Sequence, residues 1–245
     1  MDNRFSCMSL AHIVAVTMLL CIAAHTDAKD DKTGEKGFTR IFNGKDLTGW
    51  EGDKSAWHVK GGAIATVGGK SKKNWLIWRK GETKDFELRL KFKYSKGNSG
   101  VQVRSKEIEK WMVRGYQVEI AAHTKMGLWH HSLSPSKHRS HLAIAGQRVT
   151  IAPDGSKKVE KLGDPKKIQA VCKDNEWNDL VVIARGSRLI QKINGVVFAD
   201  LTDNEDKYSS RSGLLALQDH GKGCVAAFKD IRIKHFKAEG KSEKK

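Results

Sequence analysis

Apolar and charged residues alternate with a period of two over residues 86–94, which read FELRLKFKY. Successive side chains of a β-strand point to opposite faces, so this spacing predicts a strand with one face in a core. The predicted core face carries five apolar side chains: Phe86, Leu88, Leu90, Phe92 and Tyr94. We expect the first four of these side chains to be buried together.

Similar alternating segments follow, separated by turns. Residues 97–100 read GNSG and predict a turn, after which residues 101–104 and 116–120 alternate again. Asn194-Gly195 suits a two-residue type I′ turn, so the segments on either side of it, 189–193 and 196–201, should pair as a hairpin. The remaining apolar segments predict three further strands, at residues 180–185, 214–218 and 228–236.

Nothing between residues 38 and 236 has the pattern of a long amphipathic helix. Many short strands separated by glycine-rich turns predict an all-β domain, an antiparallel β-sandwich whose two sheets each bury one face. The outer face of a curved sheet would form a groove for an extended ligand. We therefore expect one domain over residues 38–236, after a polar leader at 29–37 and before a charged tail at 237–245.

The composition is that of a globular domain, and the charge indicates which kinds of partner the protein could bind. Hydrophobic residues make up 39% of the 245 residues and charged residues 30%, which excludes a collagen-like or disordered chain. Lysine and arginine total 45 against 28 acidic residues, a formal net charge of +17. This charge is compatible with an acidic glycan as partner. The lysines are spread rather than clustered, so no nucleic acid partner is expected.

The first 28 residues have the pattern of an export signal. Arg4 precedes an apolar run at residues 13–24, and Thr26-Asp27-Ala28 offers small residues at the cleavage positions. The run is too short for a membrane span, and no other segment is long and apolar enough. We expect a periplasmic or extracellular protein without a transmembrane span. Lipid anchoring through Cys21 is less favoured, because the preceding Leu20 is bulky.

Two cysteines, Cys172 and Cys224, remain after removal of the signal. In an oxidising compartment they could form a disulfide. Two separate buried thiols are the alternative, and the spacing does not decide between them.

Four polar residues, Gln102, Arg104, Gln117 and Glu119, alternate with apolar residues in two predicted strands. All four should therefore leave the core on the same side. If the strands are neighbours, a guanidinium, a carboxylate and two amides converge there, which suits a ligand dense in hydroxyl groups. An ordinary surface ion pair is the alternative interpretation.

Five histidines occur within residues 123–141: His123, His130, His131, His138 and His141. Their spacing fits no compact zinc motif and no cysteine is near, so no metal is expected. The segment resembles a long surface loop that could lie over the groove and supply His131 or Trp129.

Leu217-Gln218-Asp219-His220-Gly221 reads as the end of a strand that runs into a turn. A histidine there suits general acid or base catalysis, or it caps the turn. The chain has no nucleophile elbow, phosphate-binding glycine loop or dinucleotide fingerprint, and we expect no cofactor.

Taken in order, a series of short motifs resembles the 3-keto-disaccharide hydrolase family, over roughly residues 38–236. The motifs are Phe42-Asn43-Gly44-Lys45-Asp46-Leu47 with Trp50, then Trp57, Gly61-Gly62, Asp85-Phe86-Glu87-Leu88, Asn98-Ser99-Gly100, Arg104, Gly115-Tyr116-Gln117-Val118-Glu119-Ile120, Trp177-Asn178-Asp179, Ile193-Asn194-Gly195-Val196, Leu217-Gln218, His220-Gly221 and Phe228-Lys229-Asp230-Ile231. The resemblance implies a concanavalin-like jelly roll. It also implies cleavage of 3-keto-glycosides by elimination and hydration, with an oxidised sugar as substrate.

Under this resemblance three residues are catalytic candidates. Glu119 suits the base that removes the C2 proton, Arg104 the group that stabilises the enolate oxygen, and His220 the acid. The substrate-binding candidates are Asn98, Gln102, Gln117, Trp129, His131 and Gln218. Two other functions fit the same fold: a non-catalytic carbohydrate-binding module, and an envelope-associated protein whose basic surface binds anionic glycan.

Overall fold

The computed structural model describes residues 35–68, 72–131 and 138–237. The predicted signal peptide, most of the polar leader and nearly all of the charged tail lie outside these ranges, as do residues 132–137 of the histidine segment. The described residues belong to one compact unit. None of the helices within these ranges is long and apolar enough to cross a membrane.

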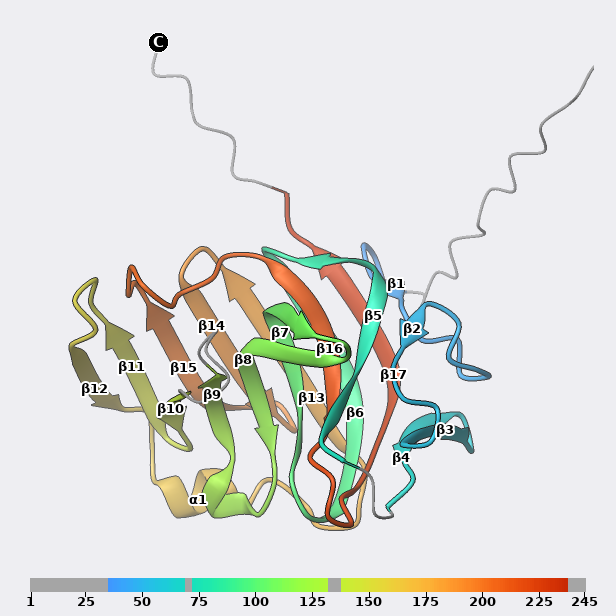
Figure 1. The fold of residues 1–245 in the computed structure, drawn as a ribbon. Helices are drawn as coiled ribbons and strands as arrows, with labels where there is room; N and C mark the ends of the chain where they lie inside the picture. Colours follow the sequence, from blue (N-terminus) through green and yellow to red (C-terminus); the bar gives the residue numbers. More distant parts are fainter. Residues whose placement is uncertain (1–34, 69–71, 132–137, 238–245) are drawn as a thin grey trace, which may run out of the picture. The chain divides into compact units, whose positions relative to one another are not determined.

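The described strands form two sheets that pack face to face (Figure 1). The larger, which we call sheet A, has ten strands. Their spatial order is β12 (Lys157–Lys161), β11 (Gln147–Ile151), β15 (Val196–Asp203), β14 (Arg188–Ile193), β13 (Asn178–Arg185), β6 (Phe86–Lys96), β17 (Val225–His235), β4 (Ala63–Thr66) and β3 (Trp57–Lys60), with β1 (Thr39–Arg40) paired to β17.

The second sheet, sheet B, has seven strands. Their order is β10 (His138–Ile144), β9 (Gly127–His131), β8 (Met112–Ile120), β7 (Ser99–Glu109), β16 (Gly213–Asp219), β5 (Asn74–Thr83) and β2 (Trp50–Glu51). The described helices are short: a 3₁₀ turn, η1 (His123–Lys125), and α1 (Pro165–Gln169). Asp164 caps α1 through its carboxylate, which accepts a hydrogen bond from the Lys166 amide at 2.9 Å.

The inner faces of the two sheets form one continuous core. Phe86, Leu88, Leu90 and Phe92 of β6 are each at most 2% exposed and lie in the same cluster, so the prediction from their alternation is confirmed. The hairpin between β14 and β15 also forms as predicted. Asn194 and Gly195 both have positive φ, of 47° and 83°, as a type I′ turn requires.

One strand pair is not antiparallel. β11 runs parallel to β15, with Gln147 opposite Ala199 and Ile151 opposite Asp203. The chain passes from β10 in sheet B to β11 in sheet A through only two residues, Ala145 and Gly146, and so reaches sheet A beside a strand that comes much later in the sequence. Parallel neighbours need a long connection, here the segment that contains α1, β13 and β14.

The two cysteines are separate buried thiols rather than a disulfide. Burial raises the pKa of both Cys172 and Cys224 to about 11, so neither is a thiolate at neutral pH. Of the two alternatives left open by the sequence, the described structure has the second.

The hairpin of β7 and β8 bends across the outer face of β16 and β5 (Figure 1). Its tip residues Trp111 and Met112 pack against Trp75, Ile77 and other buried side chains. Because the inward-facing neighbours of Trp75 and Ile77 belong to the main core, this second cluster lies on the outside of sheet B. The outer face is therefore divided by an apolar ridge.

Arg104 connects the two sheets instead of pointing outward with Gln102. The register shifts after Val103, and Arg104 has a positive φ of 48°, which breaks the alternation of the strand. Its guanidinium donates to the carbonyl oxygens of Lys84 (2.8 Å) and Gly186 (2.7 Å) and to the Asp85 carboxylate (3.1 Å). The expectation that Arg104 shares a face with the other three polar residues is wrong.

Arg104→Met should lower the free energy of unfolding by about 2–4 kcal/mol, because two turn carbonyls and a carboxylate lose a buried donor. Chemical denaturation of the purified protein would measure the change. As a control, Arg211→Met alters an exposed arginine that interacts electrostatically with Arg104 and donates a hydrogen bond to the Asp203 carbonyl oxygen at 3.0 Å. Equal stability of the two variants would contradict the structural role assigned to Arg104.

Candidate functional site

A polar pocket of about 290 Å³ lies on the outer face of sheet B. Its lining comes from β8, β9, β10, η1, the start of β7, the segment before β5 and the end of β16. The lining residues are Lys73, Asn98, Gln117, Glu119, Lys125, Trp129, His131, His141, Gln218 and His220.

Cross-strand register brings the polar residues together. Gln117 of β8 lies opposite Trp129 of β9 and Gln102 of β7, while Gly100 of β7 lies between Glu119 and Gln218. A Cβ atom at Gly100 would be 2.7 Å from Gln117 Cγ and 2.8 Å from its Nε2. The glycine of the Asn98-Ser99-Gly100 motif therefore leaves room for Gln117 to reach Gln218 across β7.

Glu119 is a buried carboxyl group, with its residue only 5% exposed. Both of its oxygens accept hydrogen bonds from amides: Oε2 from Asn98 at 2.9 Å and Oε1 from Gln117 at 2.8 Å. Burial raises the pKa of Glu119 to about 7, although these two hydrogen bonds and the nearby Lys73 act to lower it. A carboxyl group of this kind exchanges a proton near neutral pH, as acid–base catalysis requires.

Two partly buried nitrogen bases share the pocket with Glu119. Burial lowers the pKa of Lys73, Arg114 lowers it further, and Glu119 opposes the shift. Burial also lowers the pKa of His220, with Lys73 and Lys222 as the next contributors. At neutral pH the imidazole of His220 is therefore uncharged.

Aromatic rings form the opposite wall of the pocket. Trp129 packs perpendicular to His141, with ring centroids 4.7 Å apart, and its ring centroid lies 5.9 Å from that of His131. The Nδ1 atom of His131 lies 3.1 Å from Nη1 of Arg114. The partly exposed indole of Trp129 beside amides and a carboxyl group suits a sugar, which has both apolar faces and hydroxyl groups.

The histidine segment is not simply a surface loop. His130 and His131 lie in β9, and β10 begins at His138 and contains His141. His130 points to the inner side, where its ring packs at 4.7 Å on Tyr116. Within the described ranges, no three His, Cys, Asp or Glu side chains come together as metal ligands.

Seven of the nine residues predicted for the site line this pocket: Asn98, Gln117, Glu119, Trp129, His131, Gln218 and His220. Gln102 lies next to the pocket but is fully buried beneath Gln117. Three lining residues, Lys73, Lys125 and His141, lie outside the prediction. Lys73 stands one residue before a strongly apolar strand, but nothing in the sequence indicates which face of sheet B that strand end reaches.

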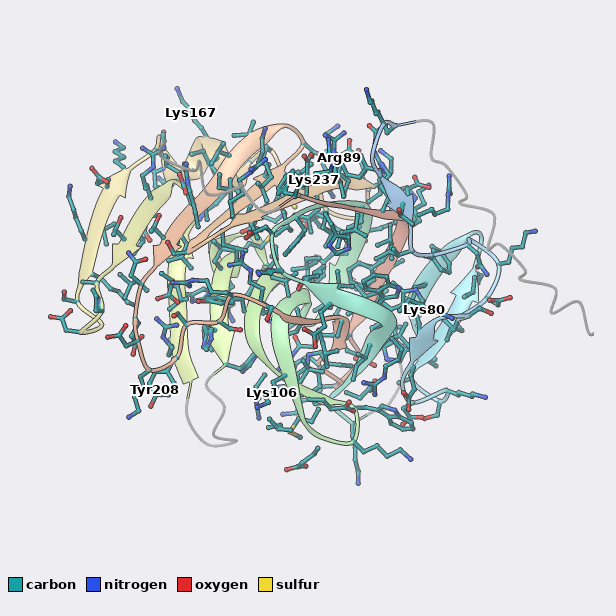
Figure 2. The ribbon with its side chains drawn as sticks, turned by 90° about the horizontal axis from the view of Figure 1, so that it is seen from above. Lys80, Arg89, Lys106, Lys167, Tyr208 and Lys237 are labelled. Carbon is teal, nitrogen blue, oxygen red and sulfur yellow. The ribbon has the colours of Figure 1, made fainter. Side chains whose placement is uncertain are left out.

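Arg104 lines a different cavity, of about 560 Å³, between β7, β8 and the loop before β16. Lys106 and Tyr208 line it as well, and Figure 2 shows both on the sheet B side of the molecule, opposite Arg89 on sheet A. Arg114 lines this cavity and also contacts His131 of the first pocket. Arg104 is thus separated from Glu119, and the two do not form one constellation.

Many solved structures are similar to this chain, and three of them illustrate the shared fold. A candidate glycosyl hydrolase of Parabacteroides distasonis is 17% identical, with a TM-score of 0.55 over 81% of this chain and 99% of its own. A protein of unknown function with a galectin-like fold from Bacillus subtilis is 10% identical (TM-score 0.52; 81% and 94%). Carbohydrate-binding module CBM66 of Bacillus subtilis is 14% identical (TM-score 0.51; 77% and 96%).

At these identities the similarity shows the fold alone, and the predicted concanavalin-like jelly roll is confirmed. No curated protein matches the chain. The family model for the 3-keto-alpha-glucoside-1,2-lyase-like domain, however, matches residues 37–234, nearly the whole span of the motifs identified in the sequence. The chain belongs to the 3-keto-alpha-glucoside-1,2-lyase-like family.

Proposed function

We propose that this protein cleaves 3-keto-glycosides, with Glu119 as the base that removes the proton from C2 of the oxidised sugar. The observation that carries the proposal is the environment of Glu119: a buried carboxyl group with a pKa of about 7, held by two amides in a pocket of sugar-binding character. Membership of the family supports the same substrate class.

The reaction follows from the acidity that a 3-keto group gives to C2. Glu119 takes the C2 proton, and the electron pair of the C–H bond forms an enolate with the C3 oxygen. The enolate then expels the C1 substituent, which leaves with a proton as the free aglycone. Water adds across the resulting C1–C2 double bond, with hydroxyl to C1 and a proton to C2, so the net reaction is hydrolysis.

We assign to Lys73 the role that was expected of Arg104, stabilisation of the enolate oxygen. It lines the pocket, interacts electrostatically with Glu119 and lies over the Trp75 ring at 5.4 Å, whereas Arg104 is committed to the turns of sheet A. An ammonium group near the C3 oxygen would stabilise the enolate. His220 is neutral at pH 7 and therefore a weak acid, so we assign it a hydrogen bond to the leaving oxygen.

The N-terminal pattern of residues 1–28 supports export, so we propose that the reaction takes place in the periplasm or outside the cell. The rival function is a carbohydrate-binding module on the same fold. In that case the pocket would hold a sugar without changing it.

Glu119→Gln should reduce kcat on a 3-keto-glucoside by about 10²–10⁴-fold, because an amide keeps the shape of the side chain but is not a base. Substrate affinity should change only a few-fold. Aglycone release and isothermal calorimetry measure the two quantities. Glu160→Gln, the same change on the exposed strand β12, is the control.

Turnover of Glu119→Gln within a few-fold of wild type would show that another group is the base. Binding of sugars by a wild-type protein that turns over no 3-keto-glucoside would favour the binding module instead. Lys73→Met should also lower kcat, and Arg104→Met should do so only through loss of folded protein.

The pH dependence should report the raised pKa of Glu119. Activity should rise with pH through about 7, because only the ionised carboxylate is a base. Stability should do the opposite: between about pH 4.5 and 7 the folded protein holds a proton that the unfolded chain releases, so the free energy of unfolding falls as pH rises. Denaturation of wild type and Glu119→Gln across this range measures the effect, and a gap independent of pH would contradict it.

A further inference from the structure

Behind Glu119, buried side chains form a continuous line of hydrogen bonds along sheet B. The Ser105 hydroxyl lies 2.7 Å from Gln102 Oε1, its shorter hydrogen bond, and 3.0 Å from the Val103 carbonyl oxygen, while Gln102 Nε2 donates to Gln117 Oε1 at 2.7 Å. Gln117 Nε2 then donates to Glu119 Oε1 and to Gln218 Oε1, both at 2.8 Å. Ser105, Gln102 and Gln117 are each at most 3% exposed, so solvent offers them few other partners.

The bonds from Ser105 through Gln102 and Gln117 all run in the same direction, toward Glu119, and Gln117 also donates to Gln218. An amide presents donors on one side and an acceptor on the other, so turning one amide over forces its neighbours to turn as well. In the reversed order Gln117 would present its oxygen to Glu119. Only a protonated Glu119 could donate to that oxygen, and an ionised carboxylate would be repelled by it.

We propose that Gln102 is a positioning residue that fixes the direction of the Gln117 amide, so that its NH₂ group faces Glu119, and that Ser105 favours this direction through its shorter hydrogen bond. Neither touches the pocket. This inference rests on the proposed function for its catalytic meaning, but its physical content, control of the charge on Glu119, does not need turnover to be tested.

The same direction determines what Gln218 offers to a ligand. Its oxygen accepts from Gln117, while its NH₂ group has no partner among the described residues, and the residue lines the pocket. The ordered line therefore presents a donor to the sugar. The reversed line would present a carbonyl oxygen, which cannot stabilise an enolate.

Other charged or titratable groups also face Glu119, and the test must leave them in place. They are Lys73 before β5, His220 after β16, Lys125 in η1, His131 on β9 and His141 on β10. Gln102 and Ser105 hydrogen-bond to none of these. A change at either residue therefore reaches Glu119 through Gln117.

The experiment is a ¹³C NMR titration of the glutamate carboxyl carbons, with Glu119→Gln identifying the Glu119 signal. Gln102→Met keeps the length of the side chain and removes its donor. We expect the titration midpoint of Glu119 to rise by about 0.5–1 pH unit, because loss of a directed amide donor disfavours the carboxylate. The apparent pKa on the acidic side of the pH profile of kcat/KM, measured on a 3-keto-glucoside, should rise by the same amount.

Gln191→Met is the matched control. Gln191 is fully buried in β14 of sheet A, and neither its oxygen nor its nitrogen has a partner among the described residues, so the substitution should leave the Glu119 midpoint unchanged. Ser105→Ala removes the donor at the far end of the line and should raise the midpoint less than Gln102→Met. If Gln102→Met does not fold, the Glu119 midpoint of Ser105→Ala alone tests the proposal.

A Glu119 midpoint within about 0.2 pH unit of wild type in the folded variants would overturn the proposal, since the effect of a lost hydrogen bond on a pKa is larger than this. A midpoint that moves as expected in a protein that turns over no 3-keto-glucoside would support the line of hydrogen bonds and refute the proposed function. The two failures are therefore distinguishable.

Discussion

The register of β9, β8, β7 and β16 is the constraint on which both the core and the candidate site depend. Side chains alternate between the two faces of a strand, so a slip of one residue in this register would turn Val118 outward and Glu119 inward. The residues that bury the inner face of sheet B thereby fix the outer face as well. Tyr116 and Val118 in the core hold Gln117 and Glu119 in the pocket.

Burial of so many polar groups on an outer face requires a cover, and the bent hairpin of β7 and β8 supplies part of it. Trp111 and Met112 pack over Trp75 and Ile77, and the resulting ridge borders the segment that carries Lys73. An amide without a partner in such a place would cost about 1–3 kcal/mol. The hydrogen bonds from Ser105 to Glu119 offset that cost and also select one arrangement of the side chains.

The charge state of the groups in this pocket is determined by burial and not by the basic composition of the chain. Burial disfavours the charge of Glu119, the one carboxyl group among the described residues that line the pocket, and it also lowers the pKa of Lys73 and of His220. A low local dielectric thus moves the pKa values of Glu119 and Lys73 toward neutral pH and keeps His220 uncharged there. The net charge of +17 acts at longer range than these contacts and does not determine the chemistry in the pocket.

The sequence by itself determined the all-β class, the core face of β6, the hairpin turn at Asn194-Gly195 and most of the pocket. These features depend on local rules: the period-two alternation, the backbone preferences of glycine and asparagine, and the spacing of Gln117 and Glu119 on one strand. Tertiary structure decided the rest. At the bulge after Val103, Arg104 turns to hydrogen-bond with the turns of sheet A. The alternating sequence pattern could not predict this, because a register shift and a positive φ depend on the partner strand. Lys73 and His141 line the pocket because β5 and β10 reach it from distant parts of the chain. Cys172 and Cys224 form no disulfide. In both cases the distance between residues far apart in the sequence is set only when the sheets pack.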